Sequence, residues 1–231
     1  MTVWIASFDI GKKNFSFYIE ECDKQELLEI PNITKNNRYC TNSTPTPSFD
    51  ALLHKVYKNG RKILLENVDL THDTNKDLYL DSLIFHNMTT LLDYYIEYWD
   101  QCDIFIIEKQ MSFRGKFNTM ALKLGQHCWS YFALKYGRSK EIIEFPAYHK
   151  TQILGAAKDE KYTKTGKISY QAINKARRKK WCITKALSIL TIKNDLDTIT
   201  YIKSTRKQDD LADVICQLQA FKYCFFIDKC I

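Results

Sequence analysis

The sequence is poor in residues that break secondary structure. It has only 7 glycines and 4 prolines in 231 residues, and three of the prolines fall between residues 31 and 60. Long apolar runs are also missing, since none approaches the roughly 20 residues that span a bilayer. With 45% hydrophobic residues the chain can bury a sizeable core, which excludes a disordered protein. We expect a single folded domain over residues 1–231, with an insertion or long loop around 31–60 and no membrane association.

CxxC pairs and zinc-type Cys/His spacings are absent among the eight cysteines. Several cysteines lie in apolar periodic segments, which is typical of buried, reduced thiols. The N-terminus reaches the acidic Asp9 too early for a signal peptide and lacks the arginines of a transit peptide. We therefore expect an intracellular, reducing compartment.

Acidic residues are missing from two segments. Residues 109–140 hold seven Lys or Arg and residues 161–185 hold nine, with no Asp or Glu in either. The net charge of the whole chain is only +7, so the rest of the chain is net acidic. This segregation indicates a basic surface for a polyanion beside an acidic site, although solvated helix faces also produce basic runs.

Apolar periodicity predicts an alternation of strands and helices. Strands are expected at 3–8, 14–20, 102–110 and 141–145, with a further strand at either 26–30 or 62–68. Helices are expected at 80–95, 118–136 and 168–190, and a last helix carries the sequence RKQDDLADVICQLQAF (206–221). Strands followed by strands, then helices alternating with strands, indicate an α/β fold with a mixed sheet flanked by helices.

Four carboxylates stand at the ends of predicted apolar elements: Asp9, Glu108, Asp210 and Asp213. Taken singly, acids at strand ends and helix starts are common, and the aspartates of the last helix also offset its dipole. Together they form an oxygen donor set without His or Cys, which suits Mg²⁺ or Mn²⁺. Two such metals stabilise the attacking and leaving oxygens of a phosphodiester displacement. The turn FDIGKKN alone is also typical of sugar kinases and actin-like ATPases, but those need more residues and no DDLAD cluster.

These motifs resemble the RuvC-like Holliday junction resolvases of the RNase H-like (retroviral integrase) superfamily. FDIGKKN is similar to the first-strand motif of that family, IIEKQ to its second acid and DDLAD to its closing helix. ALKLGQ (121–126) and HKTQILGAAKDEK (149–161) resemble two further family segments, in the family's order. The Lys-, Asn- and Ile-rich composition would suit a branch from a large DNA virus, such as the poxvirus-type resolvases. The resemblance implies an RNase H-like mixed β-sheet flanked by α-helices.

The same resemblance implies roles for particular residues. Asp9, Glu108, Asp210 and Asp213 would be the metal-binding catalytic acids. Lys150 and Lys161 match basic positions near the scissile phosphate, and Asp209, just before the paired aspartates, would have a supporting or capping role. The family also places a base-stacking aromatic after the second acid, where counting gives either Met111 or Phe113; we choose Phe113, for which core packing is an equally good reading.

The basic segments supply the expected DNA contacts. The residues predicted to bind DNA are Lys109, Phe113, Arg114, Lys116, Lys123, Arg177, Arg178, Lys179 and Lys180.

The function implied is that of a Mg²⁺-dependent, structure-selective endonuclease that cuts four-way DNA junctions symmetrically, leaving 5′-phosphates and 3′-hydroxyls. The resemblance implies two Mg²⁺ ions per site, with Mn²⁺ as a substitute, no small-molecule cofactor and a homodimer. A viral enzyme of this kind would act in the host cytoplasm or nucleus where viral DNA is replicated. Alternatives are a nuclease of the same fold acting on flaps, forks or RNA–DNA hybrids, and a non-catalytic junction-binding protein.

Overall fold

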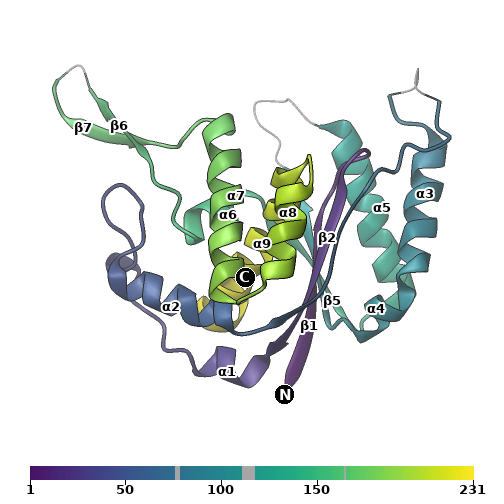
Figure 1. Ribbon diagram of the computed structural model, residues 1–231, viewed down its shortest axis with the longest axis horizontal. Helices are drawn as coiled ribbons and strands as arrows, with labels where there is room; N and C mark the ends of the chain where they lie inside the picture. Colours follow the sequence, from purple (N-terminus) through teal and green to yellow (C-terminus); the bar gives the residue numbers. More distant parts are fainter. Residues whose placement is uncertain (76–78, 111–117, 164) are drawn as a thin grey trace. The chain divides into compact units, whose positions relative to one another are not determined.

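The computed structural model describes residues 1–75, 79–110, 118–163 and 165–231 (Figure 1). They form two compact units. Met1–Cys22 and Gly60–Ala147 make up one, here called the sheet unit; Asp23–Asn59 and Tyr148–Ile231 make up the other, here called the helical unit. No helix among the described residues is long and apolar enough to cross a membrane.

The sheet unit is built on a five-stranded mixed sheet with strand order β3-β2-β1-β4-β5. The strands are β1 (Thr2–Asp9), β2 (Phe15–Asp23), β3 (Arg61–Val68), β4 (Ile104–Lys109) and β5 (Glu141–Pro146). β1 pairs in parallel with β4, and β4 with β5, whereas β2 and β3 are antiparallel. The predicted strands are thus present, and the choice left open for the third strand falls on 62–68. Residues 26–30 instead belong mainly to a helix, α1 (Lys24–Glu29).

Helices α3 (Ser82–Tyr94), α4 (Ile96–Gln101) and α5 (Thr119–Tyr136) pack on one face of this sheet through an aromatic core. Phe8 of β1 lies against Trp99 of α4 and Phe132 of α5, with ring centroids 5.5 and 5.3 Å apart. Phe105 of β4 stacks on Phe132 at 4.1 Å. Offset and edge-on ring pairs of this kind stabilise a core beyond the area that they bury. The predicted helices at 80–95 and 118–136 are confirmed.

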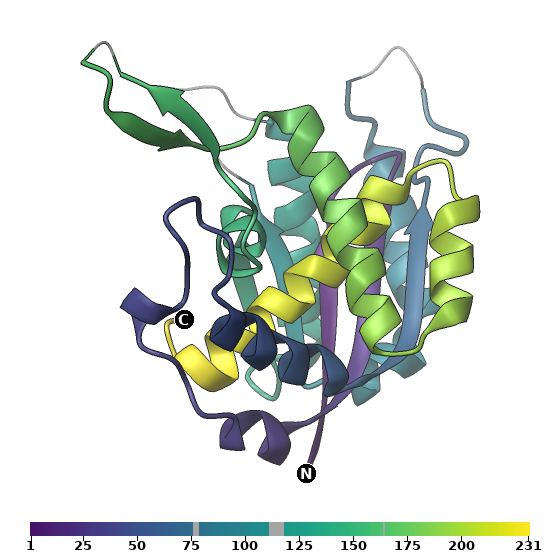
Figure 2. The same ribbon diagram turned by 60° about the vertical axis from the view of Figure 1, so that its left-hand side comes forward.

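The helical unit is organised around α9 (Gln208–Lys222). It also contains α1, the 3₁₀ turn η1 (Lys35–Asn37), α2 (Pro47–Lys58), α6 (Tyr148–Ile153), the ribbon β6 (Asp159–Tyr162) and β7 (Ile168–Gln171), α7 (Lys175–Ile192), α8 (Leu196–Ser204) and the π-helical turn η2 (Tyr223–Asp228). α9 contacts α6, α7, α8 and α2 (Figure 2). Val214, Leu218 and Phe221 of α9 are buried, as their spacing predicts.

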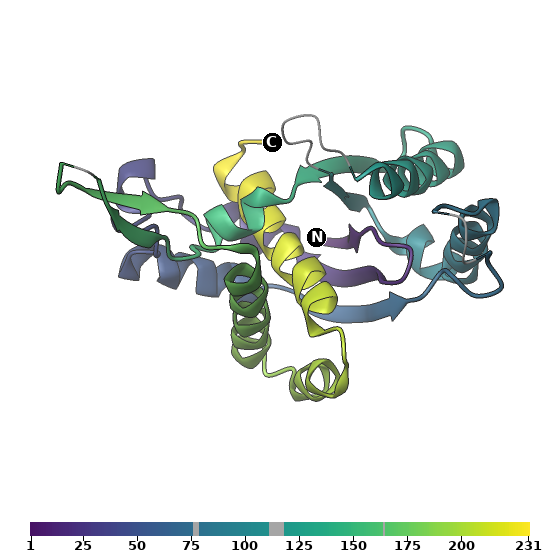
Figure 3. The same ribbon diagram turned by 90° about the horizontal axis from the view of Figure 1, so that it is seen from above.

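Two predictions about this unit are wrong in part. The helix expected at 168–190 begins only at Lys175, because residues 168–171 pair with β6 as a two-stranded ribbon that leads into α7 (Figure 3). The segment 31–60, expected to be an insertion or a long loop, contains the helix α2. Thr46 caps α2 by accepting a hydrogen bond from the Phe49 N–H, and Pro47 stands at the first helical position, where its missing N–H does no harm.

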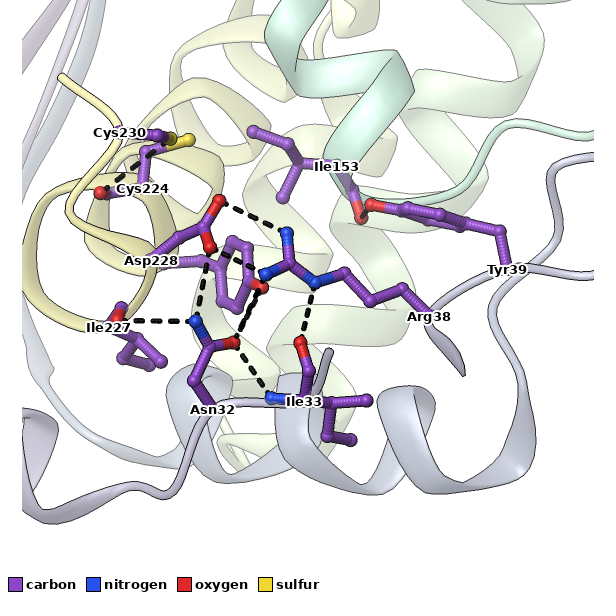
Figure 4. Close-up of polar contacts among 10 residues, drawn as sticks. Asn32, Ile33, Arg38, Tyr39, Ile153, Cys224, Ile227, Asp228 and Cys230 are labelled. Atoms are coloured by element: carbon purple, nitrogen blue, oxygen red, sulfur yellow. Dashed lines mark hydrogen bonds and ion pairs between the residues drawn. The ribbon is translucent and has the colours of Figure 1, made fainter. Parts of the chain in front are cut away.

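The part of 31–60 that precedes α2 is held by the end of the chain (Figure 4). The Arg38 guanidinium binds the Asp228 carboxylate through two nitrogen–oxygen contacts of 2.5 and 3.0 Å, and its Nε donates to the Ile33 carbonyl at 2.8 Å. Asn32 Nδ2 donates to Asp228 Oδ1 at 3.0 Å. Because both charged side chains are about nine-tenths buried, this bidentate pair fixes the segment to η2.

Candidate active site

In the sheet unit, Asp9 and Glu108 lie at the carboxyl ends of adjacent parallel strands. The register pairs Phe8 with Ile107, so the next pair along is Asp9 with Glu108. Phe8 and Ile107 belong to the apolar core, and successive side chains of a strand point to opposite faces. Asp9 and Glu108 therefore project side by side from the face opposite that core. Because neighbouring strands lie about 4.8 Å apart, two carboxylates in this position favour a shared cation.

In the helical unit, the acids of the DDLAD motif open α9. Asp209 and Asp210 stand in its first turn, and its N-cap residue, Lys207, makes no side-chain capping bond. The Asp209 carboxylate pairs with Lys179 of α7. Burial alone would raise the pKa of Asp209, but the Lys179 ammonium and the backbone N–H of Asp209 itself outweigh burial and lower it. The supporting or capping role of Asp209 stays a prediction.

The carboxyl group of Asp210 ionises less readily than that of an ordinary aspartate. Burial, followed by the neighbouring Asp209 carboxylate, raises the pKa of Asp210 to about 6. Its Oδ2 is buried and accepts no hydrogen bond from the residues that the structure describes. A buried carboxylate oxygen without a donor carries an uncompensated desolvation penalty, which a bound cation would relieve.

Asp213 is held by two side chains that converge on the same oxygen. Lys150 Nζ of α6 lies 3.0 Å from Asp213 Oδ1, and the thiol of Cys182 in α7 donates to that atom at 3.1 Å. Lys150 is buried, so its ammonium is directed at the carboxylate and away from bulk water. The motif match identifies Lys150, but Cys182 is missed, since nothing in the sequence distinguishes it from the other cysteines of apolar segments.

Some of the predicted DNA-binding cations are engaged with acids. Arg177 of α7 contacts Asp159 of β6 at 2.5 Å, and Lys109 lies 3.8 Å from Glu144 in a solvent-exposed pair. Exposed pairs like these two are weak. Lys179 is paired with Asp209, as described above, and the Asp209 side chain is only 17% exposed.

The remaining predicted cations are Lys123 on α5 and Lys161, Arg178 and Lys180 in the helical unit, and all four are exposed. Of the two lysines expected near the scissile phosphate, Lys150 contacts Asp213 of α9, and Lys161 lies in β6. Phe113, Arg114 and Lys116, with the alternative Met111, lie outside the described residues.

The four candidate metal ligands are carboxylates that come from both units. Asp9 and Glu108 belong to the sheet unit and Asp210 and Asp213 to the helical unit, and within the described ranges no group of three or more His, Cys, Asp or Glu forms a ready-made metal site. The chemistry fits nevertheless, because every candidate donor is a carboxylate oxygen and Asp210 Oδ2 is left without a hydrogen bond.

Comparison with solved structures establishes the fold. A fowlpox virus resolvase in complex with its substrate Holliday junction DNA superposes with a TM-score of 0.53, at 15% sequence identity, over 96% of this chain and 99% of that chain. The mixed sheet in the order 3-2-1-4-5, with its flanking helices, is the RNase H-like fold of resolvase structures. The predicted fold class is confirmed.

Comparison with other sequences gives the family. No family model matches the chain. Uncharacterized protein 97L of Invertebrate iridescent virus 3 is 29% identical over 231 residues, which cover 94% of this chain and 98% of that protein. Uncharacterized protein 170L of Invertebrate iridescent virus 6 is 35% identical over 240 residues, covering 98% of this chain and 92% of that protein. The chain therefore belongs to the family of protein 170L.

Proposed function

We propose that this protein is a Mg²⁺-dependent, structure-selective DNA endonuclease that resolves four-way junctions by symmetric paired nicks. The observation that carries the proposal is the register of β1 and β4, which aligns Asp9 with Glu108 at two strand ends of an RNase H-like sheet. A binding module would gain nothing from carboxylates aligned beside a polyanion, which disfavours the non-catalytic alternative.

Asp9, Glu108, Asp210 and Asp213 would hold the metal, with Mn²⁺ as a substitute for Mg²⁺. When bound, two such ions lower the pKa of water and neutralise charge on the phosphate oxygens of an in-line hydrolysis that leaves a 5′-phosphate and a 3′-hydroxyl. The raised pKa of Asp210, about 6, keeps this carboxyl partly protonated near that pH.

The lysines and the basic helix would act on the DNA itself. Lys150, buried against Asp213, orients that carboxylate and offsets part of its charge. Lys161 and the amino-terminal turns of α7 present exposed cations to phosphate. Binding should therefore weaken steeply as the salt concentration rises, because less free energy is gained when counterions are released from the DNA. Proteins 170L and 97L come from iridescent viruses, so the place of action that we propose is the host cytoplasm or nucleus where viral DNA is replicated.

The deciding experiment compares cleavage of a synthetic four-way junction, a fork, a flap, an RNA–DNA hybrid and linear duplex in Mg²⁺. We expect rapid cleavage of the junction and at least roughly 100-fold slower cleavage by Asp210→Asn, since removing one electrostatic catalytic group typically costs that much. The matched control is Asp197→Asn, which changes an exposed aspartate in the first turn of α8 and should leave cleavage unchanged.

Each part of the proposal has its own contradicting outcome. Equal cleavage of linear duplex and junction would refute junction selectivity, and preference for a fork, flap or hybrid would identify a different substrate. Full activity of Asp210→Asn would refute the site, while binding of the junction without any cleavage in Mg²⁺ or Mn²⁺ would leave the non-catalytic alternative.

A further inference from the structure

The helical unit contains a cavity of about 360 Å³ that the site described above does not use. Three segments enclose it: the loop that follows Arg38, residues 148–158 from α6 onward, and the connection from β7 into α7. Tyr39, Tyr148, Lys158 and Arg178 are among its lining side chains. Its volume lies within the range of small-ligand sites, roughly 300–1,000 Å³.

The walls are fixed by contacts between the loop and the segment after α6. The Tyr39 hydroxyl donates to the Ile153 carbonyl at 3.1 Å (Figure 4), and the Lys158 N–H donates to the Asn42 carbonyl at 2.8 Å. Gly155 has φ +75°, and a Cβ there would lie 2.3 Å from Cδ of Pro45. The close approach therefore requires glycine, and the cavity is formed before any ligand arrives.

The lining has a particular chemical character. Two aromatic rings provide flat surfaces, and Tyr148 is 43% exposed, so its ring is accessible to a ligand. Lys158 and Arg178 add two cations, and among the described residues no carboxylate lines the cavity or pairs with either of them. The adjacent Arg177, by contrast, is already paired with Asp159. A ligand that satisfies this lining has a flat, stackable ring and a negative charge, and a nucleotide combines both.

We propose that this cavity binds one unpaired nucleotide of a branched DNA, with the base stacked on Tyr148 and its phosphate between Lys158 and Arg178. The choice of DNA over a free nucleotide rests on the proposed function and on the position of Arg178 at the exposed start of α7, beside Lys179 and Lys180. The proposal gives part of the 31–60 segment a role, since its loop forms one wall. The cavity would thereby recognise unpaired bases, which a matched duplex lacks.

The test is equilibrium binding of the full chain without divalent metal, so that no cleavage occurs. The probes are a duplex with a single-nucleotide bulge, the same duplex fully matched, a four-way junction, and thymidine monophosphate as a competitor. We expect the bulged duplex to bind more tightly than the matched one by roughly 5- to 100-fold, the range that one base–aromatic stack provides. Ala157→Trp, which fills the cavity, should abolish this preference while leaving affinity for matched duplex unchanged.

Ala51→Trp is the matched control, because Ala51 is exposed on α2 and lines a different hollow. It should retain the preference. If Ala157→Trp does not fold, Tyr148→Ala should lose the preference and Tyr148→Phe should keep it. The proposal is overturned if wild type shows no preference, if the cavity-filling variant keeps it, or if thymidine monophosphate binds wild type and not Ala157→Trp while the bulge has no effect. A bulge preference in a protein that never cleaves junctions would refute the proposed function and leave this inference standing.

Discussion

Asp210 ionises against both burial and the charge of Asp209, and its raised pKa has a consequence for stability. The folded state holds the proton to about pH 6, whereas an unfolded aspartate releases it near pH 3.9. Between these values the folded state binds more protons, so stability falls as pH rises and then stays level. The full shift corresponds to about 3 kcal/mol, which solvent screening of a half-buried group reduces to about 1 kcal/mol.

Asp210→Asn should therefore stabilise the protein at neutral pH while it slows cleavage. We expect the free energy of unfolding to rise by about 1 kcal/mol at pH 7 and to change little at pH 4, where the wild-type carboxyl is protonated in the folded state. Urea unfolding at the two pH values measures the difference. A variant that is less stable than wild type at pH 7 would contradict the view that ionised Asp210 destabilises the folded state.

Lys150 and Asp213 should be energetically coupled, because the ammonium is buried 3.0 Å from Asp213 Oδ1. Removing one partner leaves a buried charge without its counterion, so we expect Lys150→Met and Asp213→Asn each to lower the free energy of unfolding by about 2 kcal/mol. The double variant should lose less than the sum of the two, by about 1 kcal/mol or more. If the losses measured by urea unfolding are strictly additive, the interaction between Lys150 and Asp213 contributes nothing to the free energy of unfolding.

At the scale of elements, the Arg38–Asp228 pair joins the loop before α2 to the C-terminal turn η2. Arg38→Met should lower the free energy of unfolding by about 2–4 kcal/mol, since it strands a buried carboxylate. Arg38→Lys keeps the charge but cannot make the bidentate contact of the planar guanidinium, and we expect it to lower the free energy of unfolding by less. Thermal unfolding of both variants checks this order; equal stability of Arg38→Met and wild type would mean that the loop is held by other contacts.

The elements that could be predicted from the sequence are those whose apolar pattern is strong and local. The runs 3–8 and 102–110 are continuous enough to be strands, and Val214, Leu218 and Phe221 repeat at helical spacing. The segment 31–60 is harder to predict, because its prolines and polar residues favour a loop and outweigh a helix start signal, Thr46 followed by Pro47.

The β6–β7 ribbon could not be predicted because its sequence carries no strong apolar pattern. Its strands are four residues each and mostly exposed, so pairing between strands, with little burial, determines their conformation. At the candidate site, the acids follow from motif order, but the thiol of Cys182 on Asp213 depends on the packing of α7 against α9, which no local pattern encodes.

At the scale of the molecule, both units are built from segments that are distant in sequence. The chain leaves the sheet unit after Cys22, returns at Gly60 and leaves again after Ala147. Neither unit is therefore a continuous fragment that can be excised, and contacts such as Arg38–Asp228 close long loops within the helical unit. Pairing at such sequence separation slows folding, because loop-closure entropy is lost before the contacts form.

Symmetric resolution requires two active sites, and we therefore predict a homodimer. Sedimentation equilibrium at micromolar concentration should give twice the chain mass of 27.2 kDa. A cruciform plasmid should be converted to linear product directly, because both nicks fall within one binding event. A strict monomer, with and without junction DNA, or the accumulation of singly nicked circles would contradict paired cleavage.

The β6–β7 ribbon, finally, would give a direct readout of the proposed DNA binding. It is a two-stranded element with Tyr162 and Ile168 exposed at 73% and 53% in one cross-strand pair, so few packed side chains resist its opening. Trypsin should accordingly cut first beside Lys161 or Lys167, leaving two large fragments. Junction DNA that covers this ribbon would slow that cut, and the course of binding could be followed as an intact band on a gel.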